Sequence, residues 1–168
     1  LPPFKADVGV KDGMISAVAA QISANCAQRV LDAHGLSLCP GFIDSHGHSD
    51  ISILAAPEAL GKISQGITTE ITGNCGLSAF PVTDLNRDHL QSLYARYGIK
   101  IDWSDLSGYA RKLNRIRPAI NIASLCGHNT LRAAVSGYGE KPLGGQKLRK
   151  MLSLLGDNLE AGAVGLST

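Results

Sequence analysis

The amino-acid sequence predicts an α/β fold: the first half of a (β/α)8 barrel of the TIM type, preceded by a β-rich segment. From residue 40 onward, four apolar strand-like runs alternate with segments of helical periodicity, an order that favours parallel strands with right-handed crossovers. These units occupy about 130 residues, whereas a complete barrel takes roughly 250. A doubly wound sheet also has this order, but no G-x-G-x-x-G motif follows the first strand.

The first 39 residues lack any helical period. Residues 6–19 hold two apolar, partly alternating runs joined at Lys11-Asp12-Gly13, which predicts a hairpin. Residues 28–32 predict a further strand. We therefore place a domain boundary between 1–39 and 40–168.

The predicted barrel begins with residues 40–50, a buried strand that runs into a polar loop. A short helix is expected from Pro57 to about Gly66. Residues 67–72 predict the second strand, and residues 73–76 form the loop that follows it.

The later elements follow the same alternation. Residues 85–97 carry apolar side chains at roughly helical spacing, and Ser104 is the expected N-cap of another helix, which Pro118 ends. A third strand, a final helix and a fourth strand are then predicted at residues 119–128, 148–159 and 161–167.

Composition excludes several classes of protein. The formal net charge of +2 is too small to indicate a nucleic-acid or charged-membrane partner, and no apolar run approaches the roughly 20 residues of a membrane span. The four cysteines match no zinc finger or disulfide framework, which favours a reduced, cytoplasmic protein. The chain lacks an initial Met and ends on a strand-like run, so we expect a fragment of a longer protein.

His46-Gly47-His48 is the sharpest chemical feature, at the end of the first predicted barrel strand. Side chains two apart on a strand face the same way, so both imidazoles could converge on one metal ion. The carboxyl ends of barrel strands carry the active site in this architecture. A polar loop with solvated histidines is the alternative, and the strand-end position favours the metal site.

Cys75 follows the second predicted strand at the position equivalent to that of the histidine pair. A thiolate is a good zinc ligand, although a free cysteine is usually a small buried hydrophobe. The histidine pair on the neighbouring strand favours the ligand interpretation.

Four further residues are candidates for a supporting role around this site. His128, after the third strand, could be a ligand or could order a loop, and Arg132 could bind a carboxylate or lie at the surface. Asp44 shares the face of the histidine pair by period-two counting, and Asp50 lies beyond the pair; either could orient a ligand histidine. Glu70, inside the second strand, is expected to be a buried, paired carboxylate.

These motifs resemble the amidohydrolase superfamily, and within it the D-aminoacylase or N-acyl-D-amino-acid deacylase branch. PGFIDSHGHSD (residues 40–50) is similar to the first-strand metal motif of the superfamily. KISQGITTEITGNCGLSAFP (62–81) has the cysteine that follows the second strand in the branch. ASLCGHNTLRAAVSG (123–137) and AGAVGLST (161–168) are also similar to it, so the resemblance covers nearly all of the chain.

The resemblance implies that residues 1–39 are part of a small β-sandwich and that zinc is the cofactor. His46 and His48 would belong to one metal position, and Cys75 would bridge to a second. The bridging cysteine replaces the carboxylated lysine that many relatives place on the fourth strand, and residues 161–168 contain no lysine. The remaining ligands and the catalytic aspartate are expected downstream of residue 168, so no catalytic residue is assigned.

The activity implied is hydrolysis of the linear amide of an N-acyl-D-amino acid to a carboxylic acid and a D-amino acid. Two alternatives stay open. One is a catalytically incomplete fragment or interaction module; the other is a cyclic-amide hydrolase of the dihydroorotase or hydantoinase type, which Cys75 and the lysine-free fourth strand disfavour. By itself, the fragment is expected to self-associate and to be inactive.

Overall fold

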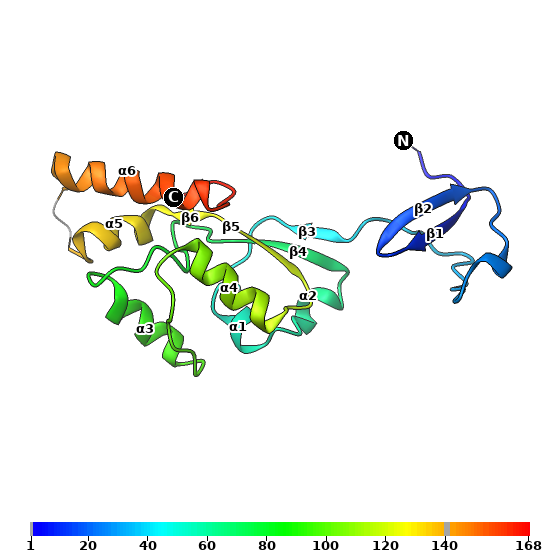
Figure 1. Cartoon of the computed structure of the whole chain (residues 1–168), viewed down its shortest axis with the longest axis horizontal. Coiled ribbons are helices and arrows are strands. Elements are labelled where there is room, and N and C mark those ends of the chain that lie inside the picture. The colour runs from blue at the N-terminus through cyan, green and yellow to red at the C-terminus, as the bar shows by residue number, and fades with distance from the viewer. Residues whose placement is uncertain (1, 140–141) are drawn as a thin grey trace. The chain divides into compact units, whose positions relative to one another are not determined.

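An antiparallel hairpin forms the regular part of the first of two compact units, Leu1–Pro40 and Gly41–Thr168 (Figure 1). The computed structural model describes residues 2–139 and 142–168. Strands β1 (Asp7–Lys11) and β2 (Met14–Ala19) pair antiparallel. Asp12 and Gly13 both have positive φ, 52° and 76°, as a two-residue hairpin turn of type I′ requires. The predicted hairpin is therefore confirmed.

The strand predicted at residues 28–32 is wrong. This segment has no regular structure, and the described part of the first unit adds only a short 3-10 helix, η1 (Ala24–Cys26). Val30 and Leu31 are exposed. A strand is stable only when a neighbouring strand satisfies its backbone groups, and local apolar character does not supply that neighbour.

The second unit is built on parallel strands in chain order. Strand β4 (Ile67–Thr72) pairs with β3 (Phe42–Asp44) on one side and β5 (Asn121–Ser124) on the other. Strand β6 (Cys126–Gly127) continues β5 after one residue and pairs with β7 (Leu166–Ser167). The predicted mixed α/β fold with a parallel sheet is confirmed.

Two details of these strands differ from the prediction. The third strand is divided at Leu125, because Leu125 N–H donates to the Thr72 carbonyl of β4 whereas Cys126 N–H donates to the Gly165 carbonyl beside β7. Strand β3 is not buried: Phe42 is 58% exposed and Ile43 is 65% exposed. Because β3 is the edge strand of its three-stranded sheet, an apolar sequence there does not ensure burial.

Six α-helices connect and follow these strands in the described residues. They are α1 (Ser52–Ala55), α2 (Leu60–Ile63), α3 (Arg87–Ala95), α4 (Leu106–Ile116), α5 (His128–Ser136) and α6 (Gly145–Glu160). The short helix expected from Pro57 is confined to α2, and the helices expected at 85–97 and 148–159 correspond to α3 and α6. Helices α1 and α5 were not predicted. Helix α5 begins directly after β6, with Gly127 as its N-cap, so no loop composition marks its start.

Helix α4 begins one residue later than the sequence predicts. Its N-cap is Asp105, whose carboxylate accepts from Gly108 N–H at 2.8 Å, whereas Ser104 hydrogen-bonds the Asp105 side chain. No helix in the described ranges is long and apolar enough to cross a membrane.

An aromatic cluster anchors the segment that follows β4. The side chains of Phe80, Tyr94, Trp103 and Tyr109 are buried and their rings contact one another. Trp103 donates from its indole nitrogen to the Ala79 carbonyl at 2.9 Å. Buried aromatic rings contribute large apolar area, and their polar atoms need a partner. The cluster therefore holds residues 79–82 against α4, just beyond the loop that carries Cys75.

Candidate metal centre

The histidine turn and the cysteine loop meet at the carboxyl ends of two paired strands. The chain leaves β3 at Asp44 and turns through His46 and His48, while the loop after β4 carries Cys75. Gly47 N–H donates to the Ile71 carbonyl at 3.0 Å, which ties the turn to the end of β4. Parallel strands direct their carboxyl ends to one edge of a sheet, so these two loops become neighbours.

Three ligand-type side chains converge there. Cys75 Sγ lies 3.4 Å from His46 Nε2 and 3.7 Å from His48 Nε2. The two imidazole rings are 5.4 Å apart and nearly perpendicular, with an interplanar angle of 68°. One nitrogen from each histidine and the sulfur all lie within 4.8 Å of one another, and all three residues are exposed. Such a group could hold a metal ion.

Cys75 reaches the histidines from a left-handed backbone conformation, with φ 53°. This conformation is costly for a residue that has a Cβ, so the loop must be held by other contacts. Asn74 provides two of them, since its amide donates to the carbonyls of Gly47 (3.1 Å) and Ile71 (2.9 Å). Gly76 N–H donates to Ser167 Oγ at 3.0 Å, which links the loop to β7.

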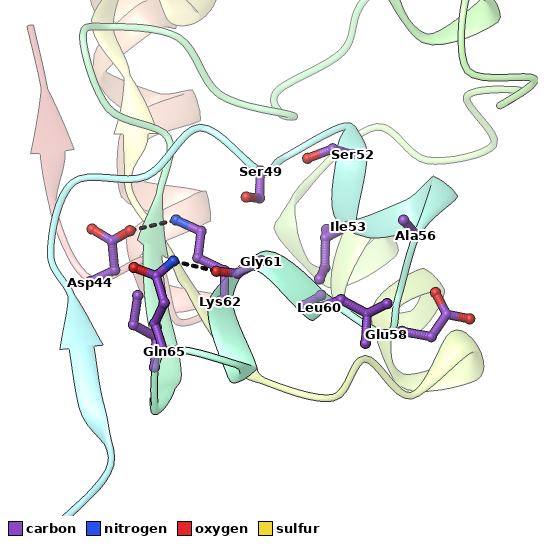
Figure 2. A pocket seen from close by; sticks show the side chains of 12 residues that line it. Asp44, Ser49, Ser52, Ile53, Ala56, Glu58, Leu60, Gly61, Lys62 and Gln65 are labelled. Carbon is purple, nitrogen blue, oxygen red and sulfur yellow. Dashed lines mark hydrogen bonds and ion pairs between the residues drawn. The ribbon is translucent and has the colours of Figure 1, made fainter.

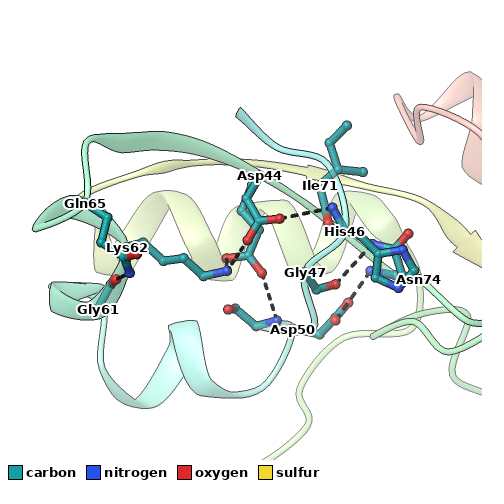
Figure 3. A network of polar contacts seen from close by, with 12 residues as sticks. Asp44, His46, Gly47, Asp50, Gly61, Lys62, Gln65, Ile71 and Asn74 are labelled. Carbon is teal, nitrogen blue, oxygen red and sulfur yellow. Dashed lines mark hydrogen bonds and ion pairs between the residues drawn. The ribbon is translucent and has the colours of Figure 1, made fainter. Parts of the chain in front are cut away.

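Asp44 contacts the backbone at the start of the histidine turn. Its carboxylate accepts from the His46 backbone N–H at 3.1 Å and forms an ion pair with Lys62 (Figure 3). The hydrogen bond from Lys62 is the main cause that lowers the pKa of Asp44, and the hydrogen bond from the His46 N–H lowers it further. Strand β3 ends at Asp44, so the histidines lie in the turn beyond it, and the role of Asp44 in orienting one of them stays a prediction.

Asp50 lies buried beneath the cysteine loop. One carboxylate oxygen accepts from Gly73 N–H at 3.4 Å, and the Asp50 carbonyl accepts from the Tyr109 hydroxyl at 2.8 Å. Burial raises the pKa of Asp50 to about 6. Asp50 therefore joins the backbone of the two loops to α4, and its role in orienting a histidine stays a prediction.

Glu70 and Lys62 make contacts near the site that the sequence predicted only in part. Glu70 is completely buried and accepts from Ser49 N–H at 3.2 Å, and Lys62 Nζ lies 3.5 Å from its other carboxylate oxygen. An acidic residue inside a predicted strand indicated a buried, paired carboxylate. Nothing in the sequence indicated Lys62, because its partners come from two strands that only folding brings to α2.

The structure places His128 and Arg132 on α5. His128 is its first residue and Arg132 lies one turn later; both are half-buried. Neither belongs to the group of converging ligand atoms found in the described part of the chain. Their predicted roles in ligation, loop ordering or carboxylate binding stay predictions.

An open pocket of about 660 Å³ adjoins the histidine turn (Figure 2). Its lining includes Asp44 of β3, Ser49 of the loop before α1 and Lys62 of α2, but His46, His48 and Cys75 do not line it. A molecule in this pocket would not contact the converging ligand atoms, so we do not assign it as a substrate site.

The chain shows extensive similarity to known hydrolases. The sequence pattern of a family described as "Amidohydrolase family" matches residues 29–168. The chain is 40% identical to an N-acyl-D-glutamate deacylase and 35% identical to a D-aminoacylase, both of Alcaligenes xylosoxydans xylosoxydans. Each alignment covers 99% of this chain and 34% of the relative, so the chain spans about a third of the length of the curated relatives it matches.

The fold is also similar to that of a solved structure. This is an N-acyl-D-glutamate deacylase from Bordetella bronchiseptica complexed with zinc and a phosphonate inhibitor, a mimic of the reaction tetrahedral intermediate. The TM-score is 0.88 at 39% sequence identity, and the match covers 100% of this chain and 35% of the other.

Proposed function

Because the chain belongs to the amidohydrolase family, we propose that the protein is a zinc-dependent hydrolase of N-acyl-D-amino acids. It cleaves the linear amide to a carboxylic acid and a D-amino acid. The observation that carries this proposal is the convergence of His46, His48 and Cys75 at the ends of two paired parallel strands. The similarity to deacylases of N-acyl-D-amino acids supports the substrate class.

The three side chains fit a zinc ion. Zinc binds histidine nitrogen at about 2.0–2.1 Å and cysteine sulfur at about 2.3 Å, so tetrahedral ligation separates N and S by about 3.6 Å. The observed separations of 3.4 and 3.7 Å bracket this value. Thiolate and imidazole ligands also favour zinc, whereas magnesium and calcium favour oxygen ligands.

His46, His48 and Cys75 would hold the zinc ion, which would supply Lewis-acid polarisation of the scissile carbonyl and a lowered pKa for a water molecule. In this chain, Cys75 supplies a negatively charged ligand and the histidines supply neutral ones. The exposure of all three leaves room for a substrate on the solvent side of the site. The general base and the remaining ligands are not assigned to residues of this chain.

We also propose that residues 40–168 form the first four β/α units of a (β/α)8 barrel and that residues 1–39 form part of a small β-sandwich. Parallel pairing in chain order supports the barrel units, and the β1–β2 hairpin supports the sandwich. In a barrel of this kind the carboxyl ends of the strands carry the active site, which is where the three candidate ligands lie.

The test is an assay of the native gene product that contains this sequence. N-acetyl-D-glutamate, N-acetyl-D-aspartate and N-acetyl-D-leucine are the substrates, and their L-enantiomers and a hydantoin are the controls. We expect turnover of at least one D-substrate, its loss after chelation and its recovery with zinc. Hydrolysis of the hydantoin without turnover of any D-substrate would contradict the proposal and favour a cyclic-amide hydrolase.

A further inference from the structure

We propose that the carboxylates of Asp44 and Glu70, paired with the ammonium group of Lys62, form a clamp that positions the His46–Gly47–His48 turn for metal binding. The inference rests on the zinc site proposed above. The three side chains come from β3, α2 and β4. Those of Asp44 and Glu70 accept from the backbone N–H groups of His46 and Ser49, and that of Lys62 pairs with both carboxylates. They act through the histidines and are therefore positioning residues.

The two carboxylates hold the turn on both sides of His48. Asp44 accepts from the His46 backbone N–H at 3.1 Å, and Glu70 accepts from the Ser49 backbone N–H at 3.2 Å. Hydrogen bonds to an ionised acceptor are stronger than neutral ones. Because both amides are fixed, the backbone between them is restricted. This restriction also limits the directions in which the two imidazole side chains can point.

Gly47 shows how closely Glu70 packs against this turn. A Cβ placed on Gly47 would overlap the Glu70 carboxylate. The φ angle of Gly47 is not positive, so the position needs glycine for space rather than for backbone freedom. The carboxylate thus occupies the volume that any other side chain between the two histidines would require.

Lys62 supplies the positive charge that this arrangement requires. A fully buried carboxylate such as Glu70 is stable as an anion only beside a compensating charge. Lys62 Nζ lies 3.5 Å from Glu70 Oε2 and forms an ion pair with Asp44. Partial burial lowers the pKa of Lys62, but the interactions with the carboxylates of Asp44 and Glu70 outweigh this effect, so its pKa is raised. Figure 3 shows the lysine reaching from α2 to the two strands.

The direct test is zinc affinity, measured in the native gene product by competition with a chromophoric chelator. His46→Ala first identifies the zinc position that the histidine pair serves. Groups that orient metal ligands typically contribute 10–100-fold to affinity, so we expect Glu70→Gln and Lys62→Met to raise the Kd of that position by about this factor. Glu70→Gln keeps the volume of the side chain but removes its charge.

Lys112→Met is the matched control. It removes the Lys112–Asp102 ion pair (2.9 Å), whose lysine is as exposed as Lys62, at 26% against 27%. Surface pairs of this kind contribute little, and this one joins α4 to the segment before it rather than to the histidine turn. We expect the Kd of zinc to be unchanged in Lys112→Met.

A second readout separates positioning from a purely structural role. The visible spectrum of the protein saturated with Co²⁺ reports the geometry of the ligands. We expect altered band intensities in Glu70→Gln, whereas a residue that only stabilises the fold would lower the unfolding temperature without changing the spectrum.

The possible outcomes decide between the two proposals. An unchanged zinc Kd and an unchanged Co²⁺ spectrum in folded Glu70→Gln would overturn the clamp and leave the zinc site standing. If Glu70→Gln does not fold, Lys62→Met is judged by the same two criteria. A wild-type protein that binds no zinc would overturn both the clamp and the proposed function.

Discussion

At the scale of single residues, Cys75 has two features expected of a metal ligand: an exposed thiol and two imidazole nitrogens within 3.7 Å of its sulfur. We expect Cys75→Ser to lower both bound zinc and deacylase turnover in the native gene product, because a neutral hydroxyl is a poor substitute for a soft thiolate. Zinc analysis after dialysis and an assay with N-acetyl-D-amino acids measure the two effects.

Cys26→Ser is the control for this substitution. Cys26 is also an exposed free cysteine, but it lies in η1 of the first unit and does not belong to the group of converging ligand atoms found in the described residues. Circular dichroism should show that both variants fold. Normal zinc content and normal turnover in folded Cys75→Ser would mean that the thiol is not a ligand.

The four cysteines also differ in their expected reactivity. Cys26, Cys39 and Cys75 are exposed, whereas Cys126 is buried in β6, and burial raises the pKa of its thiol to about 12. Because the thiolate is the reactive form, we expect iodoacetamide at pH 8 to modify the three exposed residues in the folded, metal-free protein. Added zinc should protect Cys75 alone, as peptide mass spectrometry would show.

Two results would contradict this pattern. Modification of Cys126 at a rate similar to that of the exposed cysteines would contradict its buried position. Equal labelling of Cys75 with and without zinc would contradict ligation by its sulfur, and Cys26 and Cys39 serve as internal standards for both comparisons.

At the scale of secondary-structure elements, helix α4 connects the site to the core. Tyr109 packs in the aromatic cluster and donates to the Asp50 carbonyl, and Asp105 caps the first turn. Loss of an N-cap typically costs about 1 kcal/mol. We expect Asp105→Ala to lower the free energy of unfolding by about this amount, measured by urea denaturation.

Ser104→Ala tests the position that the sequence favoured. The Ser104 hydroxyl hydrogen-bonds the Asp105 side chain rather than a helix amide, so we expect a much smaller loss of stability. A larger effect for Ser104→Ala than for Asp105→Ala would show that the helix begins where the sequence analysis placed it.

At the scale of the whole molecule, apolar side chains are exposed on the first and the last of the parallel strands, β3 and β7. Phe42 and Ile43 are exposed on β3, and Val164 and Leu166 are exposed at or beside β7. Edge strands with exposed apolar side chains pair readily with other chains. We expect the 168-residue chain expressed alone to self-associate at micromolar concentration, to bind zinc weakly and to show no deacylase turnover. Light scattering and the enzyme assay measure this.

A charge on the edge strand provides the comparison. Lysine on an edge strand opposes pairing, so Ile43→Lys should lower the associated fraction of the isolated chain. A stable, active monomer of 17.6 kDa would refute the expected self-association and inactivity of the 168-residue chain.

The sequence predicted the main elements because their signals are local. Period-two alternation and an Asp-Gly turn predict the β1–β2 hairpin, and alternating apolar runs predict parallel strands in chain order. Burial of each strand was less predictable. β3 has an apolar sequence but lies at an edge, and residues 28–32 have an apolar sequence but no partner strand.

By itself, the sequence predicted the candidate metal ligands: two histidines and a cysteine at the ends of successive strands, which the structure brings together. Only the tertiary structure decided how they are held, because Lys62, Asp44 and Glu70 belong to three different elements. Periodicity reports which way a side chain points from its own helix or strand. A hydrogen-bond partner depends on the distance between elements, and that distance is set by packing over the whole second unit.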